Sequence, residues 1–128
     1  MRERQVRRLA AGLGLVTLAF GATPLLAPRL FSRLCGFSEP DTAVGSMVRS
    51  LGVRDTVMGL GLWSAAAHGG AYAPWLLARL LVDGGDTLSV GLAAARGWRN
   101  RRFLALGGLA LGATAVDAGL YALARRAS

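Results

Sequence analysis

The stretch WLLARLLVDGGDTLSV, residues 75–90, places one arginine and two aspartates in a segment rich in Leu, Val and Gly. Arg79, Asp83 and Asp86 are spaced i, i+4 and i+7, which puts them on one face of an α-helix, with Trp75 at its head. A charge at bilayer depth costs roughly 2.5–3.5 kcal/mol per residue on insertion scales. We therefore expect this face to point into the protein, toward charged side chains on other helices.

The surrounding sequence predicts that those other helices also lie in a membrane. Charges gather in short islands, so that residues 9–28 carry none and residues 104–124 carry only Asp117, whereas the surface helices of a soluble bundle are charged along their outer faces. Hydrophobic residues make up 53% of the 128 residues, and mean hydropathy is +0.43. The sequence predicts one all-α domain over residues 1–128. We expect this domain to be an integral four-helix bundle of the cell membrane, with helices at about 9–27, 43–67, 75–95 and 103–124.

The chain ends and connections refine this prediction. Residues 28–37 mix apolar and basic side chains, which is typical of a short amphipathic segment at the membrane interface. A basic start followed by an apolar run also resembles a signal peptide, but no small-x-small cleavage pattern follows, and we expect the first helix to be retained. Six arginines flank each side of the four predicted spans, so the positive-inside rule leaves the orientation open.

The net charge of +8 comes entirely from arginine, because lysine is absent. These arginines lie mostly at segment ends, where they meet lipid headgroups, so we expect membrane lipid and not nucleic acid as a partner. The single cysteine, Cys35, excludes an intrachain disulfide and a cysteine-based metal or redox pair. Assembly into a homo-oligomer stays open.

Seven ionisable residues lie inside the predicted helices. At a rise of ~1.5 Å per residue, carboxylates from three of these helices lie at one depth, near the middle of the ~30 Å hydrocarbon core of the bilayer. Three arginines and four aspartates leave one excess negative charge, so we expect one carboxylate to keep a proton. The seven residues are Arg49, Arg54, Asp55, Arg79, Asp83, Asp86 and Asp117.

This cluster suggests an acid–base site for a lipophilic substrate, such as an isoprenoid or polyketide. The hypothesis is cyclisation, isomerisation or epoxide opening without a cofactor, since a neutral carboxylic acid beside ionised ones can donate a proton. No metal is expected, because the arginines compete for the carboxylates. The candidate acids and bases are Asp55, Asp83, Asp86 and Asp117; the candidate substrate-binding residues are Arg49, Arg54, Arg79, Trp75 and Tyr121.

A structural role is the alternative. Arg–Asp pairs can hold membrane helices together and set their register, in which case the protein is a non-enzymatic partner subunit or a small proton- or solute-coupled carrier. Small residues at helix contacts would serve either function. Gly45, Gly52 and Gly59 recur every seven positions, and Gly108 with Gly112 forms a small-xxx-small pair, so we expect close packing at both.

Three stretches carry a resemblance to a known family. RSLGVRD at residues 49–55 followed by Gly59, LAPRLFSRLCGF at residues 26–37, and Arg79-x3-Asp83-x2-Asp86 are similar to small bacterial and fungal membrane proteins described as a domain of unknown function (number 4267). The resemblance extends over nearly the whole chain. It implies a four-helix membrane protein and brings no established activity.

Overall fold

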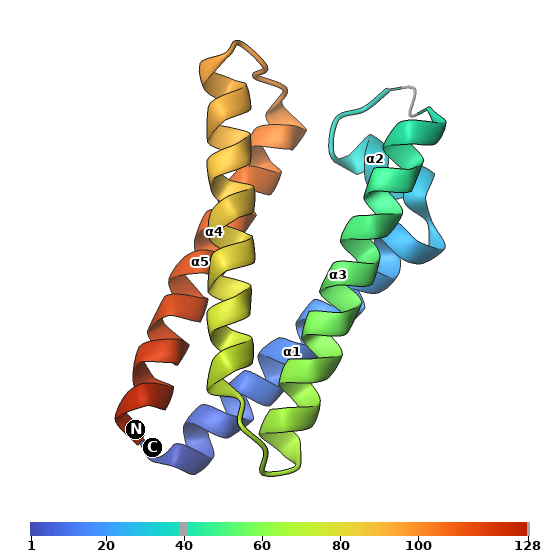
Figure 1. Cartoon of the computed structure of the whole chain (residues 1–128). Helices are drawn as coiled ribbons and strands as arrows, with labels where there is room; N and C mark the ends of the chain where they lie inside the picture. The colour runs from blue at the N-terminus through green and yellow to red at the C-terminus, as the bar shows by residue number, and fades with distance from the viewer. Residues whose placement is uncertain (39–40, 128) are drawn as a thin grey trace.

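The computed structural model describes residues 1–38 and 41–127, and its regular elements in these ranges are all helices. In chain order they are α1 (Glu3–Leu26), α2 (Pro28–Leu34), α3 (Thr42–Ala67), α4 (Ala73–Ala95) and α5 (Arg101–Ala127) (Figure 1). The four long helices lie close to the predicted bounds, and α2 occupies the predicted interfacial segment. The Asp41 side chain accepts a hydrogen bond from the Val44 backbone N–H at 2.8 Å and so caps the start of α3.

Helix α1 is longer than the apolar run predicted. It begins at Glu3, before the run starts, and it continues through Pro24. The polar first turns are held by Arg7, whose guanidinium donates to the Gly70 carbonyl at 2.9 Å and lies 4.7 Å from the centroid of the Tyr72 ring. This carbonyl lies just beyond the end of α3, where backbone carbonyls have no partner within the helix, and Arg7 supplies it with a hydrogen-bond donor.

The helices form two hairpins, α1 with α3 and α4 with α5 (Figure 1). Glycines allow the first hairpin to close: a Cβ added at Gly14 would lie 2.5 Å from the Trp63 backbone nitrogen, and one at Gly52 would lie 2.9 Å from the Gly21 carbonyl oxygen. Gly14 and Gly21 are spaced by seven residues, like Gly52 and Gly59 on the facing helix. Close backbone packing of this kind is common between membrane helices.

The glycine prediction was therefore correct for Gly52 and Gly59 and wrong for the other three positions. A Cβ added at Gly45, Gly108 or Gly112 would meet no atom within 4 Å. The seven-residue period carries Gly45 beyond the part of α3 that α1 covers closely. The α4–α5 hairpin uses another glycine, Gly107, where an added Cβ would lie 2.5 Å from Val90 Cγ1.

The two hairpins meet closely at one end and separate toward the other, so that α3 and α4 contact each other over only a small part of their length (Figure 1). Consecutive long helices therefore pack side by side within each hairpin, whereas α3 and α4 do not. Apolar residues from all four long helices fill the closed end, including Val6, Leu62, Leu76 and Leu120. A smaller cluster of Phe31, Cys35 and Val48 packs against Leu106 near the open end.

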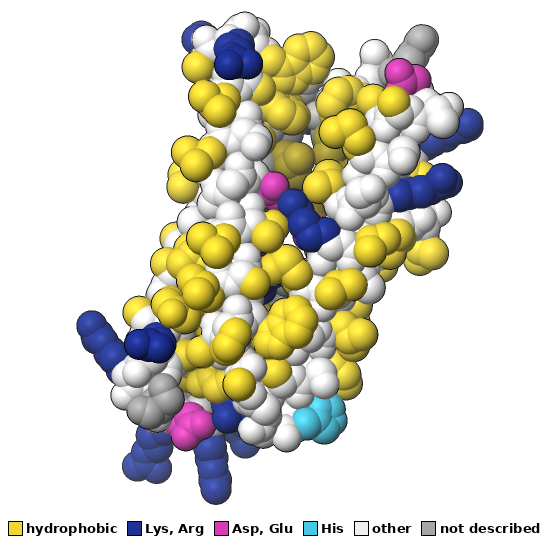
Figure 2. All heavy atoms as spheres, viewed as in Figure 1, with side chains coloured by type: hydrophobic (Ala, Val, Ile, Leu, Met, Phe, Trp, Pro, Cys, Tyr) yellow, Lys and Arg dark blue, Asp and Glu magenta, His cyan; other side chains and the backbone are white. Residues whose placement is uncertain are grey.

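The outer surface is unusually apolar. Every long helix exposes large hydrophobic side chains, among them Val16, Met47, Leu88 and Leu109 at 64%, 70%, 70% and 63% (Figure 2). The accessible area is 7988 Å², against roughly 6,500 Å² expected for a compact soluble chain of this mass. Two helices, α1 and α5, are long and apolar enough to cross a membrane.

Candidate functional site

The first group of charged residues surrounds Arg79, which is buried between the hairpins. Its Nε donates to Asp117 Oδ1 at 3.0 Å, its Nη2 donates to Asp83 Oδ2 at 3.0 Å, and its Nη1 donates to the Thr17 hydroxyl. These partners lie on α5, on α4 itself and on α1. One guanidinium therefore ties three helices together and holds two carboxylates beside each other.

The second group surrounds Arg54 on α3. Its two terminal nitrogens donate to Asp86 Oδ1 and Oδ2 at 3.1 and 2.8 Å, a bidentate pair that joins α3 to α4. Its Nε donates to Asp55 Oδ1 at 3.1 Å. The long Arg54 side chain thus contacts both its neighbour in sequence and a residue of the other hairpin. This group is more open, with 30% of the Arg54 side chain and 39% of the Asp86 side chain exposed.

The two groups are arranged reciprocally. Each arginine binds at least one aspartate of its own hairpin, and each also reaches the other hairpin: Arg54 contacts Asp86, and Arg79 contacts Thr17. Asp83 and Asp86 are about one turn apart on α4, so the groups are neighbours. The structure thus brings together all four predicted aspartates and two of the three predicted arginines.

The third arginine, Arg49, is exposed and lies outside the cluster, contrary to the prediction. It lies five positions before Arg54 in sequence, which turns it about 140° from Arg54 around the α3 axis. The cluster therefore has two arginines and four aspartates. Its formal charge with every group ionised is −2, where the sequence suggested −1.

The two predicted aromatic site residues take other positions. Trp75 covers Gly61 of α3, where an added Cβ would overlap its ring. Tyr121 packs against the apolar cluster at the closed end of the molecule. Both residues thus contribute to helix packing.

Three threonines complete the site and were not predicted. Thr17 accepts from Arg79, while the Thr87 hydroxyl donates to the Asp83 carbonyl at 2.8 Å and lies 3.4 Å from the Thr114 hydroxyl. The sequence places Thr114 about one turn before Asp117 on the same helix face, and Thr17 is one of just two hydroxyl residues in the apolar run over 9–27. Which face of α1 it occupies depends on how the hairpins pack.

Asp117 is the most enclosed acid. It is 0% exposed, and its Oδ2 is buried without a hydrogen-bond partner among the residues that the structure describes. An unpaired buried acceptor is costly, and an ionised one more so. Within the described ranges, no three Asp, Glu, His or Cys side chains are grouped as a metal ion would require.

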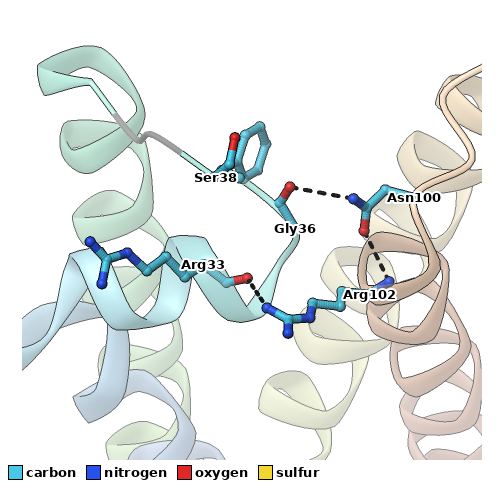
Figure 3. A pocket seen from close by; sticks show the side chains of 6 residues that line it. Arg33, Gly36, Ser38, Asn100 and Arg102 are labelled. Carbon is cyan, nitrogen blue, oxygen red and sulfur yellow. Dashed lines mark hydrogen bonds between the residues drawn. The ribbon is translucent and has the colours of Figure 1, made fainter.

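At the open end, loops from the two hairpins meet in what we call the loop bridge, formed by residues 33–38 and 98–102 (Figure 3). The Asn100 amide donates to the Gly36 carbonyl at 3.4 Å, and the Arg102 guanidinium donates to the Arg33 carbonyl at 3.1 Å. Gly36 suits this site because residues with a side chain rarely adopt its backbone φ of 98°. Asn100 lies against it.

A hollow also lies between the two hairpins. Figure 2 shows this hollow between α3 and α4, with acidic and basic side chains at its lower end. A pocket of about 320 Å³ lies at the bridge itself, lined by Arg33, Gly36, Phe37, Ser38, Asn100 and Arg102. Nearby Cys35 is buried, and this burial raises the pKa of its thiol.

Comparison with known proteins identifies the family. Residues 14–122 match the family described as "Domain of unknown function (DUF4267)", and this range contains both arginine groups. No curated protein and no solved structure gives a significant match. The chain belongs to the DUF4267 family.

Proposed function

We propose that this member of the DUF4267 family is a multi-pass membrane protein in which α1, α3, α4 and α5 all span the bilayer. The apolar side chains exposed on all four helices support this placement. The shortest of them, α4, is ~35 Å long at ~1.5 Å per residue, enough for a ~30 Å hydrocarbon core. The charges that lower the hydropathy of α3 and α4 largely pair with each other, which reduces their cost in a membrane.

The function that the geometry supports best is acid–base catalysis, without a cofactor, on a lipophilic molecule that enters from the membrane. One observation carries this proposal: four carboxylates share two guanidiniums in neighbouring groups that link the two hairpins. In a poorly solvated site the excess negative charge favours protonation of some carboxylates. Acids and ionised bases would then lie side by side, which is the arrangement that proton transfer requires.

The reaction class is isomerisation, cyclisation or epoxide opening. A protonated carboxyl group donates its proton to an alkene carbon or to an epoxide or carbonyl oxygen. A neighbouring carboxylate then takes a proton from the resulting cation, or from the water or hydroxyl group that adds to it, so no electrons are gained or lost. The more open Asp86 and Asp55 would meet the substrate, with Arg54 orienting them. Asp83 and Asp117 would hold the second proton beside Arg79.

A non-enzymatic role is the second candidate, and the Arg79 group favours it. All three nitrogens of this guanidinium make hydrogen bonds, two of them to other helices. Such a group can hold helices together as a structural ion-pair network, in a partner subunit or in a proton- or solute-coupled carrier. In that case the Arg54 group is a second structural ion pair, which joins α3 to α4.

The test is to purify the full chain in a mild detergent and identify co-purifying small molecules by mass spectrometry. The site predicts one enriched lipophilic compound that is lost in Asp86→Asn and kept in Glu3→Gln, a matched exposed acid far from the hollow. Circular dichroism checks that both variants stay helical. If the doubly apolar Arg54→Leu/Asp86→Leu variant folds and keeps the same compound, the acid–base site is wrong.

A further inference from the structure

A second cavity lies on the outer surface of the molecule and is lined by none of the clustered arginines and aspartates. It is a groove of about 450 Å³ between α1 and α5, the two helices with the composition of membrane spans. Arg8 stands at one end of it. Its walls are entirely apolar: Leu9, Gly12, Leu13, Val16, Val116 and Leu120. The volume falls within the ~300–1,000 Å³ range of small-molecule sites.

Gly12 gives the groove its depth. A Cβ at this position would meet no atom within 4 Å. This distinguishes Gly12 from Gly14 on the same helix, which is required for contact with α3. A glycine inside a helix costs up to ~1 kcal/mol relative to alanine. Helix packing within this chain does not explain that cost at Gly12, and a larger side chain there would fill the groove.

Positive charge lies at one end of the groove. Arg4 and Arg8 are exposed and one turn apart on α1. Glu3, the one acidic residue in the first sixteen, pairs with Arg7 at 3.2 Å. Both chain ends lie at this end of the molecule, and Figure 2 shows basic side chains gathered there.

We infer that this groove binds an anionic phospholipid, with an acyl chain along the apolar walls and the headgroup phosphate at Arg8 and Arg4. From Leu9 to Val16 the groove extends ~10 Å along α1, so it can hold the part of a chain nearest the headgroup. Basic sites between helices at the membrane surface recognise acidic headgroups in this way. The inference depends on the membrane placement proposed above, but it is independent of the acid–base site.

The experiment is native mass spectrometry of the full chain in detergent, titrated with phosphatidylglycerol or with phosphatidylcholine of identical acyl chains. The wild type should retain one phosphatidylglycerol at several-fold lower concentration than phosphatidylcholine. Arg8→Gln should remove that preference. Gly12→Leu should weaken binding of both lipids several-fold by filling the groove. The control Gly91→Leu changes an equally open glycine on α4 and should behave like the wild type.

Equal retention of the two lipids by the wild type would overturn the inference, as would identical binding by Gly12→Leu and Gly91→Leu. Arg8→Gln alters an exposed side chain, so it tests the headgroup contact even if Gly12→Leu fails to fold. Asp86→Asn should bind phosphatidylglycerol like the wild type, which separates this site from the acid–base cluster. A chain that is soluble without detergent and binds neither lipid would refute the membrane placement as well.

Discussion

At the scale of single residues, three arginines of the same helical core have different roles. Arg79 is 6% exposed and fully paired, Arg54 is partly exposed and paired with two aspartates, and Arg49 is exposed on the outer face of α3. Removing one partner of a buried ion pair leaves an uncompensated charge, which is costly. Solvent or headgroups can compensate a charge at an exposed position.

We therefore predict that Arg79→Met destabilises the protein by about 3–5 kcal/mol, because Asp83 and Asp117 lose their shared counter-ion. Arg54→Met should destabilise it less, and Arg49→Met should have little effect. Thermal unfolding in detergent, followed by circular dichroism, ranks the three variants. An equal loss for Arg49→Met and Arg79→Met would contradict the assignment of Arg49 to the outside of the cluster.

At the scale of elements, the α1–α3 hairpin depends on backbone contact. The distances at Gly14 and Gly52 leave no room for a Cβ unless the helices move apart. The α4–α5 hairpin has one such position, Gly107, where the clash would be with the Val90 side chain. The first hairpin is therefore the less tolerant of substitution.

Two neighbouring glycines of α1 test this directly. Gly14→Val should lower the unfolding temperature markedly, since overpacking commonly costs about 1–3 kcal/mol or more. Gly12→Ala should leave it unchanged or raise it, because alanine favours a helix by up to ~1 kcal/mol and meets no atom there. Both are measured by thermal unfolding in the same detergent. If the two variants have the same midpoint, the glycine contact does not hold α1 against α3.

The loop bridge offers a second element to test, through the single cysteine. Burial raises the pKa of the Cys35 thiol, so less thiolate is present at a given pH and alkylation by a maleimide should be slow. The rate should increase with pH and stay below that of a free thiol at pH 8. Asn100→Ala removes the contact to Gly36 and should accelerate labelling, whereas Arg99→Ala, in the same loop, should have a smaller effect. Equal rates in the wild type and Asn100→Ala would show that the bridge does not shield Cys35.

At the scale of the whole molecule, two hairpins joined at one end and held at the other by loops enclose a hollow with charges at its base (Figure 2). Multi-pass insertion requires that the α3–α4 turn and the chain ends face one side, and that α2 and the α4–α5 loop face the other. The arrangement in Figure 1 is consistent with this requirement.

Cysteine accessibility tests that topology. In a Cys35→Ser background, Arg4→Cys and Ala71→Cys should react with a membrane-impermeant maleimide from the same side of sealed vesicles. Arg99→Cys should react only from the opposite side. Right-side-out and inverted vesicles expose the two sides of the membrane to the reagent. They also decide which side the chain ends face, which the balanced arginine distribution left open. Reaction of all three cysteines from one side would exclude four spans.

By itself, the sequence determined the helices and which aspartates gather with arginines between them. Apolar runs, helix-ending residues and the spacing of Arg79, Asp83 and Asp86 are local properties, and a helix converts them directly into lengths and faces. The large cost of unpaired charge in a membrane also made pairing of the aspartates with arginines predictable.

The tertiary structure decided which groups meet. Arg49 and Arg54 look alike in sequence, yet the rotation of α3 puts only Arg54 against Asp86. Thr17 accepts a hydrogen bond from Arg79 because glycine contacts bring α1 close to α3. These contacts set which face of α1 meets α4. Helix faces follow from periodicity along one chain segment, whereas contacts between helices depend on side-chain shape summed over whole interfaces, and no local pattern carries that information.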